Sequence, residues 1–292
     1  MARQRKKNGR SEQARGGESA KEQQQQRQEN KREAEQIEER SSPPTPVIYE
    51  VVRKLGEEEM GRPATSLWWS GVAAGLSISF SLLSQAILHT HLPNAPWAHL
   101  VSSLGYSVGF MMVVLSRQQL FTENTLTVVL PVMAEPTPRN LLLLGRIWSI
   151  VLVANMAGTL FAALFCTFTP VLTPELRDGM LELSRSLMGH GWADMFFKGI
   201  SAGFLIAAMV WLMPGANAAQ FHVVTLMTYL IAAGGFTHIV AGSVEAFLLV
   251  VGGELSPWSM LADFFIPVLL GNIVGGTALF ALISYAQVMK EL

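Results

Sequence analysis

Two apolar stretches of this chain are each interrupted near their middle by a short segment that contains the dipeptide Phe-Thr. The first interruption runs from Gln119 to Asn124 and the second from Gly234 to His238. Hydrocarbon offers no hydrogen-bond partners, so backbone can leave the helix at membrane depth only where protein or a cavity surrounds it. Two interruptions with apolar sequence on both sides therefore predict a central site or pore, which is typical of transporters and channels.

The charged residues are distributed very unevenly along the chain. Fourteen of the 21 Lys and Arg residues precede Leu67, although the chain has 292 residues. Residues 1–46 have low complexity and almost no branched aliphatic side chains, so they cannot bury a core. We expect a disordered polar tail on the cytoplasmic side, and its last part, 41–46, is a proline-rich spacer.

Residues 47–62 have a different pattern. Ile48, Val51, Val52 and Leu55 recur at helical spacing, with charged side chains on the rest of the helical wheel. This pattern predicts a short amphipathic helix that lies on the inner membrane surface, in contact with lipid.

Residues 63–292 contain apolar stretches that are long enough for six membrane spans, since a crossing takes about 20 residues. An even number of spans places both termini on one side, and the basic tail predicts that this side is the cytoplasm. The expected spans are 67–89, 100–132 (interrupted), 146–168, 196–213, 221–251 (interrupted) and 264–288.

An internal repeat supports this organisation. Residues 68–76 and 196–204 both follow the pattern aromatic-aromatic-x-Gly-x-x-Ala-Gly-apolar. Asn155 and Asn272 then occur in the third and sixth spans beside small residues. Three spans per repeat is an odd number, so the two halves should be inverted in the membrane, with a path at their interface. The asparagines either bridge packed helices or position the interrupted segments.

Three motifs in this order resemble the formate/nitrite transporter family. The first is Leu120-Phe121-Thr122 with Asn124, the second is Gly235-Phe236 followed by His238, and the third is Pro267 with residues 271–276. The resemblance implies an all-α, aquaporin-like fold with interrupted second and fifth spans. It also implies a homopentamer with one pore per subunit, and passage of small monovalent anions or their conjugate acids.

Several residues depart from the family pattern. The family usually has small residues followed by an acid at 117–119 and a glycine or serine at position 123. It also usually has a glutamate before the histidine and an asparagine at position 242. Constricting phenylalanines are also common in its second and fifth spans. The departing residues are Arg117, Gln118, Gln119, Glu123, Thr237 and Gly242, with Tyr106 and Ile231 at the constrictions and Glu245 as an additional acid.

Thr122 and His238 are the central candidates for a substrate path, with Phe121, Asn124 and Phe236 beside them. A helix that starts again after an interruption presents free N–H groups and partial positive charge, which attract an anion. Thr122 either caps the second half-helix or serves as a gate, and one residue can do both. Histidine changes charge near neutral pH, so His238 could attract an anion and pass it a proton.

Three charged residues near the interruptions need partners, because charge inside a membrane is costly. Glu245 lies two helical turns after His238, on roughly the same face. Arg117 could pair with Glu245 or with Glu123. The alternatives are a role for these residues in selectivity or proton relay, or positions at the rim.

The leading hypothesis is a channel or proton-linked transporter for a small weak acid. A pore for neutral solutes and a membrane scaffold without transport are the alternatives. The sequence has no phosphate-binding loop, nucleophile elbow or dinucleotide fingerprint, so we expect no enzyme and no cofactor. His89, His91 and His99 have loose spacing and no acidic or thiol neighbour, so we expect no metal site, and nothing indicates nucleic-acid binding.

Overall fold

The computed structural model describes Lys31 and residues 43–291, and these residues form helices and connecting segments without a strand. The chain divides into two units, Met1–Pro43 and Pro44–Leu292. The fold described below is that of the second unit. Most of the predicted polar tail lies outside the described residues.

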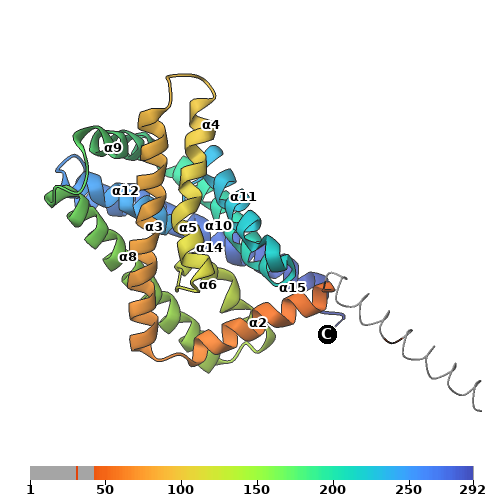
Figure 1. The fold of residues 1–292 in the computed structure, drawn as a ribbon. Coiled ribbons are helices and arrows are strands. Elements are labelled where there is room, and N and C mark those ends of the chain that lie inside the picture. Colours follow the sequence, from red (N-terminus) through yellow and green to blue (C-terminus); the bar gives the residue numbers. More distant parts are fainter. Residues whose placement is uncertain (1–30, 32–42, 292) are drawn as a thin grey trace, which may run out of the picture. The chain divides into compact units, whose positions relative to one another are not determined.

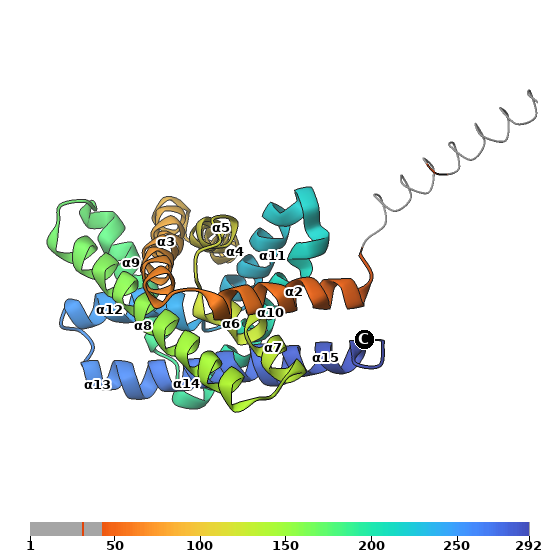
Figure 2. The same ribbon diagram turned by 90° about the horizontal axis from the view of Figure 1, so that it is seen from below.

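The first helix of this unit is α2, Thr45–Gly61, which begins inside the predicted spacer. Pro44 precedes it and Pro46 lies in its first turn, where a missing N–H costs nothing. Helix α2 packs one face against other parts of the protein, although Val51 of the predicted apolar face is exposed. Tyr49 and Val52 are buried together with Leu126, and α2 crosses one end of the helices in Figures 1 and 2.

Five helical segments are long and apolar enough to cross a membrane, and α12, Ile239–Val251, is a shorter apolar helix. The last segment contains two π-helical stretches that the sequence pattern does not reveal. The five segments are α3 (Ala64–His91); α4 (Ala98–Ser102) with η1 (Ser103–Tyr106) and α5 (Ser107–Leu115); α8 (Pro138–Phe168); α10 (Trp192–Ala216) with η2 (Asn217–Ala219) and α11 (Gln220–Ala233); and α13 (Pro257–Ser259), η3 (Met260–Phe265), α14 (Ile266–Ile273), η4 (Val274–Ala281) and α15 (Leu282–Val288).

The second predicted interruption, 234–238, is non-helical, whereas the first overlaps non-helical backbone only at 119–120, because residues 121–124 belong to the next helix. Helix α5 ends at Leu115, and α6, Phe121–Thr127, begins after five residues and leads to α7, Val129–Ala134. Helix α11 ends at Ala233, and α12 also begins after five residues. We call residues 116–120 the first loop and residues 234–238 the second loop.

The two helix pairs α3–α8 and α10–α14 are packed closely through glycine. A Cβ atom on Gly75 would lie 2.3 Å from the carbonyl oxygen of Asn155, and a Cβ atom on Gly203 would lie 2.3 Å from that of Asn272. No side chain larger than hydrogen fits at such distances. The repeated glycines of the sequence therefore bring each asparagine close to a neighbouring helix.

A further helix, α9, Pro174–Met188, occupies a segment for which the sequence analysis predicts only a long connection. The side chain of Thr173 accepts a hydrogen bond from the N–H of Leu176 at 3.3 Å and caps the helix. Met180 and Ser184 are buried, and α9 packs against α3 and α12 (Figure 1).

Candidate functional site

The first loop begins with a turn that ends helix α5. The N–H groups of Arg117 and Gln118 donate to the carbonyls of Val114 and Val113 at 3.1 and 3.0 Å. Arg117 has a φ angle of 53°, in the left-handed region that glycine usually occupies. These features form a Schellman motif, which satisfies carbonyls at the end of the helix.

The second loop begins with the same turn. The N–H groups of Gly235 and Phe236 donate to the carbonyls of Ala232 and Ile231 at 3.0 and 2.9 Å. Gly235 has a φ angle of 61° and takes the place of Arg117. The two loops therefore have equivalent backbones, although their sequences differ.

Asn155 and Asn272 hold the two loops with the same set of hydrogen bonds. The side-chain oxygen of Asn155 accepts from the N–H of Phe121 at 2.9 Å, and its amide donates to the carbonyls of Gly71 and Gln119 at 2.8 and 2.9 Å. Two of these bonds join α8 to the end of the first loop and the start of α6, and the third joins α8 to α3. Buried backbone groups that would otherwise lack partners are thus satisfied by one side chain.

The bonds of Asn272 follow the same pattern at the second loop. Its side-chain oxygen accepts from the N–H of Ile239 at 2.8 Å. Its amide donates to the carbonyls of Gly199 and Thr237 at 2.8 and 3.0 Å. Both asparagines are fully buried.

These bonds define the register between the loops and correct the sequence analysis. Phe121 is equivalent to Ile239, and Thr122 is equivalent to Val240, because each pair follows the same asparagine contact. The dipeptide Phe236-Thr237 lies earlier, inside the second loop. The dipeptide Phe121-Thr122 instead begins α6, so the two Phe-Thr dipeptides do not occupy equivalent positions.

Thr122 and His238 meet between the two loops. The hydroxyl of Thr122 lies 2.8 Å from Nε2 of His238, and both side chains are buried. Nδ1 of His238 accepts a hydrogen bond from the N–H of Ala241 at 3.2 Å and caps α12. With Nδ1 as an acceptor, neutral His238 carries its proton on Nε2 and donates to Thr122. The hydroxyl proton of Thr122 is then available to an acceptor other than His238.

Phe110 is the aromatic side chain beside this pair. Its ring centre lies 5.0 Å from that of His238 in an edge-to-face arrangement, and 5.2 Å from that of Tyr106 in a tilted arrangement. The sequence analysis assigns an aromatic constriction to Tyr106 and does not identify Phe110. Ile231, the second predicted constriction, is buried near the end of α11. Its carbonyl accepts the hydrogen bond from the N–H of Phe236 in the turn described above.

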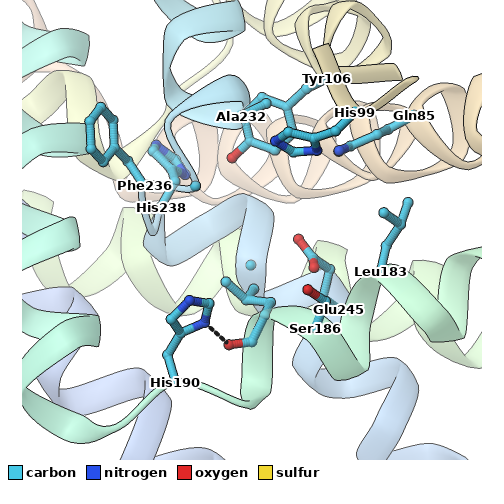
Figure 3. Close-up of a pocket in the computed structure, with 13 residues that line it drawn as sticks. Gln85, His99, Tyr106, Leu183, Ser186, His190, Ala232, Phe236, His238 and Glu245 are labelled. Carbon is cyan, nitrogen blue, oxygen red and sulfur yellow. Dashed lines mark hydrogen bonds between the residues drawn. The ribbon is translucent and has the colours of Figure 1, made fainter. Parts of the chain in front are cut away.

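A cavity of about 140 Å³ lies on one side of His238, under α9 (Figure 3). We call it the α9 cavity. Phe236 and Glu245 line it together with His238. Figure 3 shows that the remaining polar side chains come from several elements. They are Gln85 of α3, His99 of α4, Tyr106 of η1, Ser186 of α9, and His190, which follows α9.

A second cavity, of about 500 Å³, lies beside the first loop and α2. We call it the α2 cavity. Arg117 and Glu123 both line it, while Glu245 lines the α9 cavity. Within the described residues, no ion pair joins Arg117 to Glu123 or to Glu245. One carboxylate oxygen of Glu123 is buried and has no hydrogen-bond partner among these residues.

Glu59 of α2 is a residue that the sequence analysis does not single out. Its carboxylate accepts hydrogen bonds from Thr127 at 2.6 Å, Gln119 at 3.0 Å and Asn124 at 3.2 Å. Burial raises the pKa of Glu59, and the hydrogen bonds from Thr127 and Gln119 oppose this effect. Asn124 thus contacts α2 and is not among the residues that line either cavity. No local pattern could reveal Glu59, because its partners lie about 60 residues away in the sequence.

Phe121, the remaining predicted path residue, is buried against Trp148. The two rings are 5.7 Å apart in an edge-to-face arrangement. Trp148 also donates from its indole nitrogen to the carbonyl of Asn124 at 3.2 Å. Phe121 is the first residue of α6, so this contact packs the start of α6 against α8.

The sequence from 46 to 286 matches the family model described as Formate/nitrite transporter. The helical fold, the two loops and the match together define an integral membrane protein of the transporter and channel class. This chain belongs to the formate/nitrite transporter family, as the three motifs indicate.

Two relatives illustrate the range of similarity. The inner membrane protein YfdC of Escherichia coli (strain K12) is 46% identical over 245 residues, which cover 84% of this chain and 79% of YfdC. The formate channel FocA of Haemophilus influenzae is 29% identical over 241 residues, which cover 74% of this chain and 84% of FocA.

Solved structures show the same fold. A pentameric formate channel with formate bound has a TM-score of 0.65 at 20% identity, covering 78% of this chain and 98% of that one. An ion channel of the same family has a TM-score of 0.68 at 19% identity, covering 83% and 98% of the two chains.

Proposed function

We propose that this protein is a channel or proton-linked transporter for small weak acids of formate size in the bacterial inner membrane. Six spans form two inverted three-helix repeats in an aquaporin-like fold, with the first loop in the second span and the second loop in the fifth. The equivalent asparagine contacts support this repeat. Similarity to a pentameric channel supports a homopentamer with one pore per subunit.

The proposed path runs from the α9 cavity past His238 and Thr122 to the α2 cavity. With both termini in the cytoplasm, the α9 cavity faces outward and the α2 cavity faces inward. The observation that carries the proposal is the buried contact of Thr122 with His238, because each side chain comes from a different repeat. Phe110 closes one side of this contact and excludes water.

The hydrogen-bond directions define what this centre offers a solute. His238 donates to Thr122, and Thr122 in turn offers its hydroxyl proton to an oxygen of the solute. A proton on Nδ1 of His238 would displace the N–H of Ala241, so this geometry supports a neutral histidine at rest. A bare anion would lose its hydration among buried apolar side chains, which is costly. The solute therefore crosses as the neutral acid and carries one proton with it.

Uptake into liposomes tests this proposal. Purified protein would be reconstituted with a trapped pH dye, and formate, nitrite, acetate and lactate would be added at outside pH 5.5 and 7.5. We expect saturable, protein-dependent acidification with at least one acid. His238→Asn keeps an oxygen that can accept from Ala241 but lacks the Nε2 donor, so it should fold and lose the uptake.

Equal rates in protein-containing and empty liposomes, for every acid, would contradict the proposal if the protein is folded and pentameric. A pore for neutral solutes is the second candidate, and the unpaired carboxylate of Glu245 in the α9 cavity favours it. Flux of an uncharged solute such as glycerol, insensitive to the proton gradient and unaffected by His238→Asn, would identify that function.

A further inference from the structure

The α9 cavity contains one acid and no permanent cation. Of the residues that line it, Glu245 is the single carboxylate, and neither Lys nor Arg is present. Figure 3 shows the Glu245 side chain between the α3–α4 side of the cavity and α9. Within the described residues the carboxylate of Glu245 has no hydrogen bond and no ion pair. Its oxygens are therefore available to a solute in the cavity.

One basic residue on α9 and one on α3 are paired with acids outside the cavity. Arg185 makes two hydrogen bonds of 2.7 Å to Glu254, and this contact lowers the pKa of Glu254. Nε2 of His89 lies 3.3 Å from Glu182. These two basic residues are therefore balanced locally by acids outside the cavity.

The titratable groups that share the cavity with Glu245 are three histidines and a tyrosine. His99 and Tyr106 approach from the α4–η1 side, His190 follows α9, and His238 ends the second loop. Nδ1 of His190 lies 2.9 Å from the carbonyl of Leu187, so neutral His190 donates there and keeps Nε2 as an acceptor. None of these groups forms an ion pair with Glu245.

We propose that Glu245 determines the specificity of the α9 cavity, which admits a small oxyacid in its un-ionised form and rejects the corresponding anion. The carboxylate accepts a hydrogen bond from the acidic O–H of the solute. The same charge repels the anion, because like charges in a partly dehydrated cavity interact strongly. This inference rests on the proposed transport function and narrows its substrate class.

Thr122, at the centre of the proposed path, supports this choice of solute. Thr122 offers a hydroxyl proton, so a solute that passes both sites needs one donor and one acceptor. An un-ionised oxyacid has both, in its O–H and its second oxygen. Its anion lacks the donor, and a protonated amine lacks the acceptor. The cavity volume of about 140 Å³ fits an acid with few carbon atoms.

Uptake at two pH values, with the un-ionised acid held constant, tests the role of Glu245. Total formate would be raised at pH 7.5 so that its un-ionised concentration equals that at pH 5.5. Wild-type liposomes should give equal initial rates, because the added anion is not admitted. Glu245→Gln keeps an acceptor of similar shape but removes the charge, and its rate at pH 7.5 should rise on the order of tenfold.

Asp178→Asn is the matched control, since it removes a negative charge from exposed α9 without changing the cavity lining. It should behave as the wild type does. Methanesulfonate is a permanent anion, and its effect on the wild-type protein is a test that does not depend on the folding of a variant. A tenfold excess should leave wild-type uptake unchanged and slow the uptake by folded Glu245→Gln.

Three results would overturn the inference. The first is a wild-type rate that rises with the anion concentration, or that methanesulfonate slows. The second is a folded Glu245→Gln protein with the wild-type pH profile. The third is wild-type uptake of methylammonium that Glu245→Gln abolishes, which would make the site a cation site. Absence of wild-type acid uptake would instead contradict the proposed function itself, so the two failures are distinguishable.

Discussion

The first and second loops have the same backbone and different side chains. Both begin with a Schellman turn and a left-handed residue, and both are held by one buried asparagine through three equivalent hydrogen bonds. The side chains that meet between them are nevertheless not equivalent. Thr122 follows the first asparagine contact, whereas His238 precedes the second.

This difference separates the support of the site from its chemistry. The asparagines and turns keep two non-helical segments stable inside a membrane protein, where unsatisfied backbone groups are costly. Because that support is symmetric, each loop can contribute a different side chain to the centre without any change in backbone. The first loop also contacts α2 through Glu59, a contact that the second loop does not share among the described residues.

The largest expected effect comes from removal of either asparagine. Asn155→Ala and Asn272→Ala each leave one buried N–H and one buried carbonyl at a loop without partners, so each should cost about 3 kcal/mol or more of stability. Thermal unfolding in detergent measures the loss, with exposed Asn94→Ala as the control. A large cost at one site and a small cost at the other would contradict the equivalence of the two loops.

The next largest effect should come from the loss of the contact between Glu59 and the first loop. Glu59→Ala leaves the donors of Gln119, Asn124 and Thr127 without their acceptor and should weaken the docking of α2 by about 2 kcal/mol. Hydrogen exchange in α2 measures docking. The second loop should exchange at the wild-type rate, and increased exchange there would show that the asymmetry is not local.

The docking of α2 should also depend on pH. Burial raises the pKa of Glu59, so docked Glu59 holds a proton more tightly than undocked Glu59. Docking is therefore strongest below the usual range of a carboxyl group and weakens as pH rises through the raised pKa. Hydrogen exchange in α2 should accelerate over this window in the wild type and not in Glu59→Gln. A wild-type profile that is flat would contradict the buried state of this carboxyl group.

The capping role of His238 predicts a smaller effect on stability. His238→Leu removes the acceptor for the N–H of Ala241 and should cost about 1 kcal/mol, while His238→Asn keeps an acceptor and should cost less. Thermal unfolding of the two variants measures the difference. Equal stability of both variants would show that the cap contributes little and that His238 serves the path alone.

The smallest effects concern the left-handed residue of each turn. Arg117→Gly removes backbone strain and should stabilise the protein by about 0.5 kcal/mol, after the entropy of glycine is counted. Gly235→Ala adds that strain and should cost about 1 kcal/mol, although a Cβ atom there meets nothing within 4 Å. Chemical denaturation resolves these changes, and equal signs for both would contradict the equivalence of the turns.

The sequence predicts the apolar helices, all of the second loop and the last two residues of the first loop. It also identifies Asn155, Asn272, Thr122 and His238 as candidates there. Each of these has a local signal in hydrophobicity, spacing or composition. The register between the loops does not, because hydrogen bonds to the backbone set it, and the repeated Phe-Thr dipeptide therefore misleads. Phe110 and Glu59 also escape prediction, since only tertiary packing brings them to His238 and to the first loop.

The central claim is that the contact of Thr122 with His238 lies on the path of a weak acid, and formate uptake by two Thr122 variants tests it most directly. Thr122→Ser keeps the hydroxyl, and Thr122→Val keeps the shape without it. The account predicts wild-type rates within about threefold for Thr122→Ser and at least a tenfold loss for Thr122→Val, consistent with a lost hydrogen bond of about 1.5 kcal/mol. Wild-type uptake by folded, pentameric Thr122→Val would contradict it.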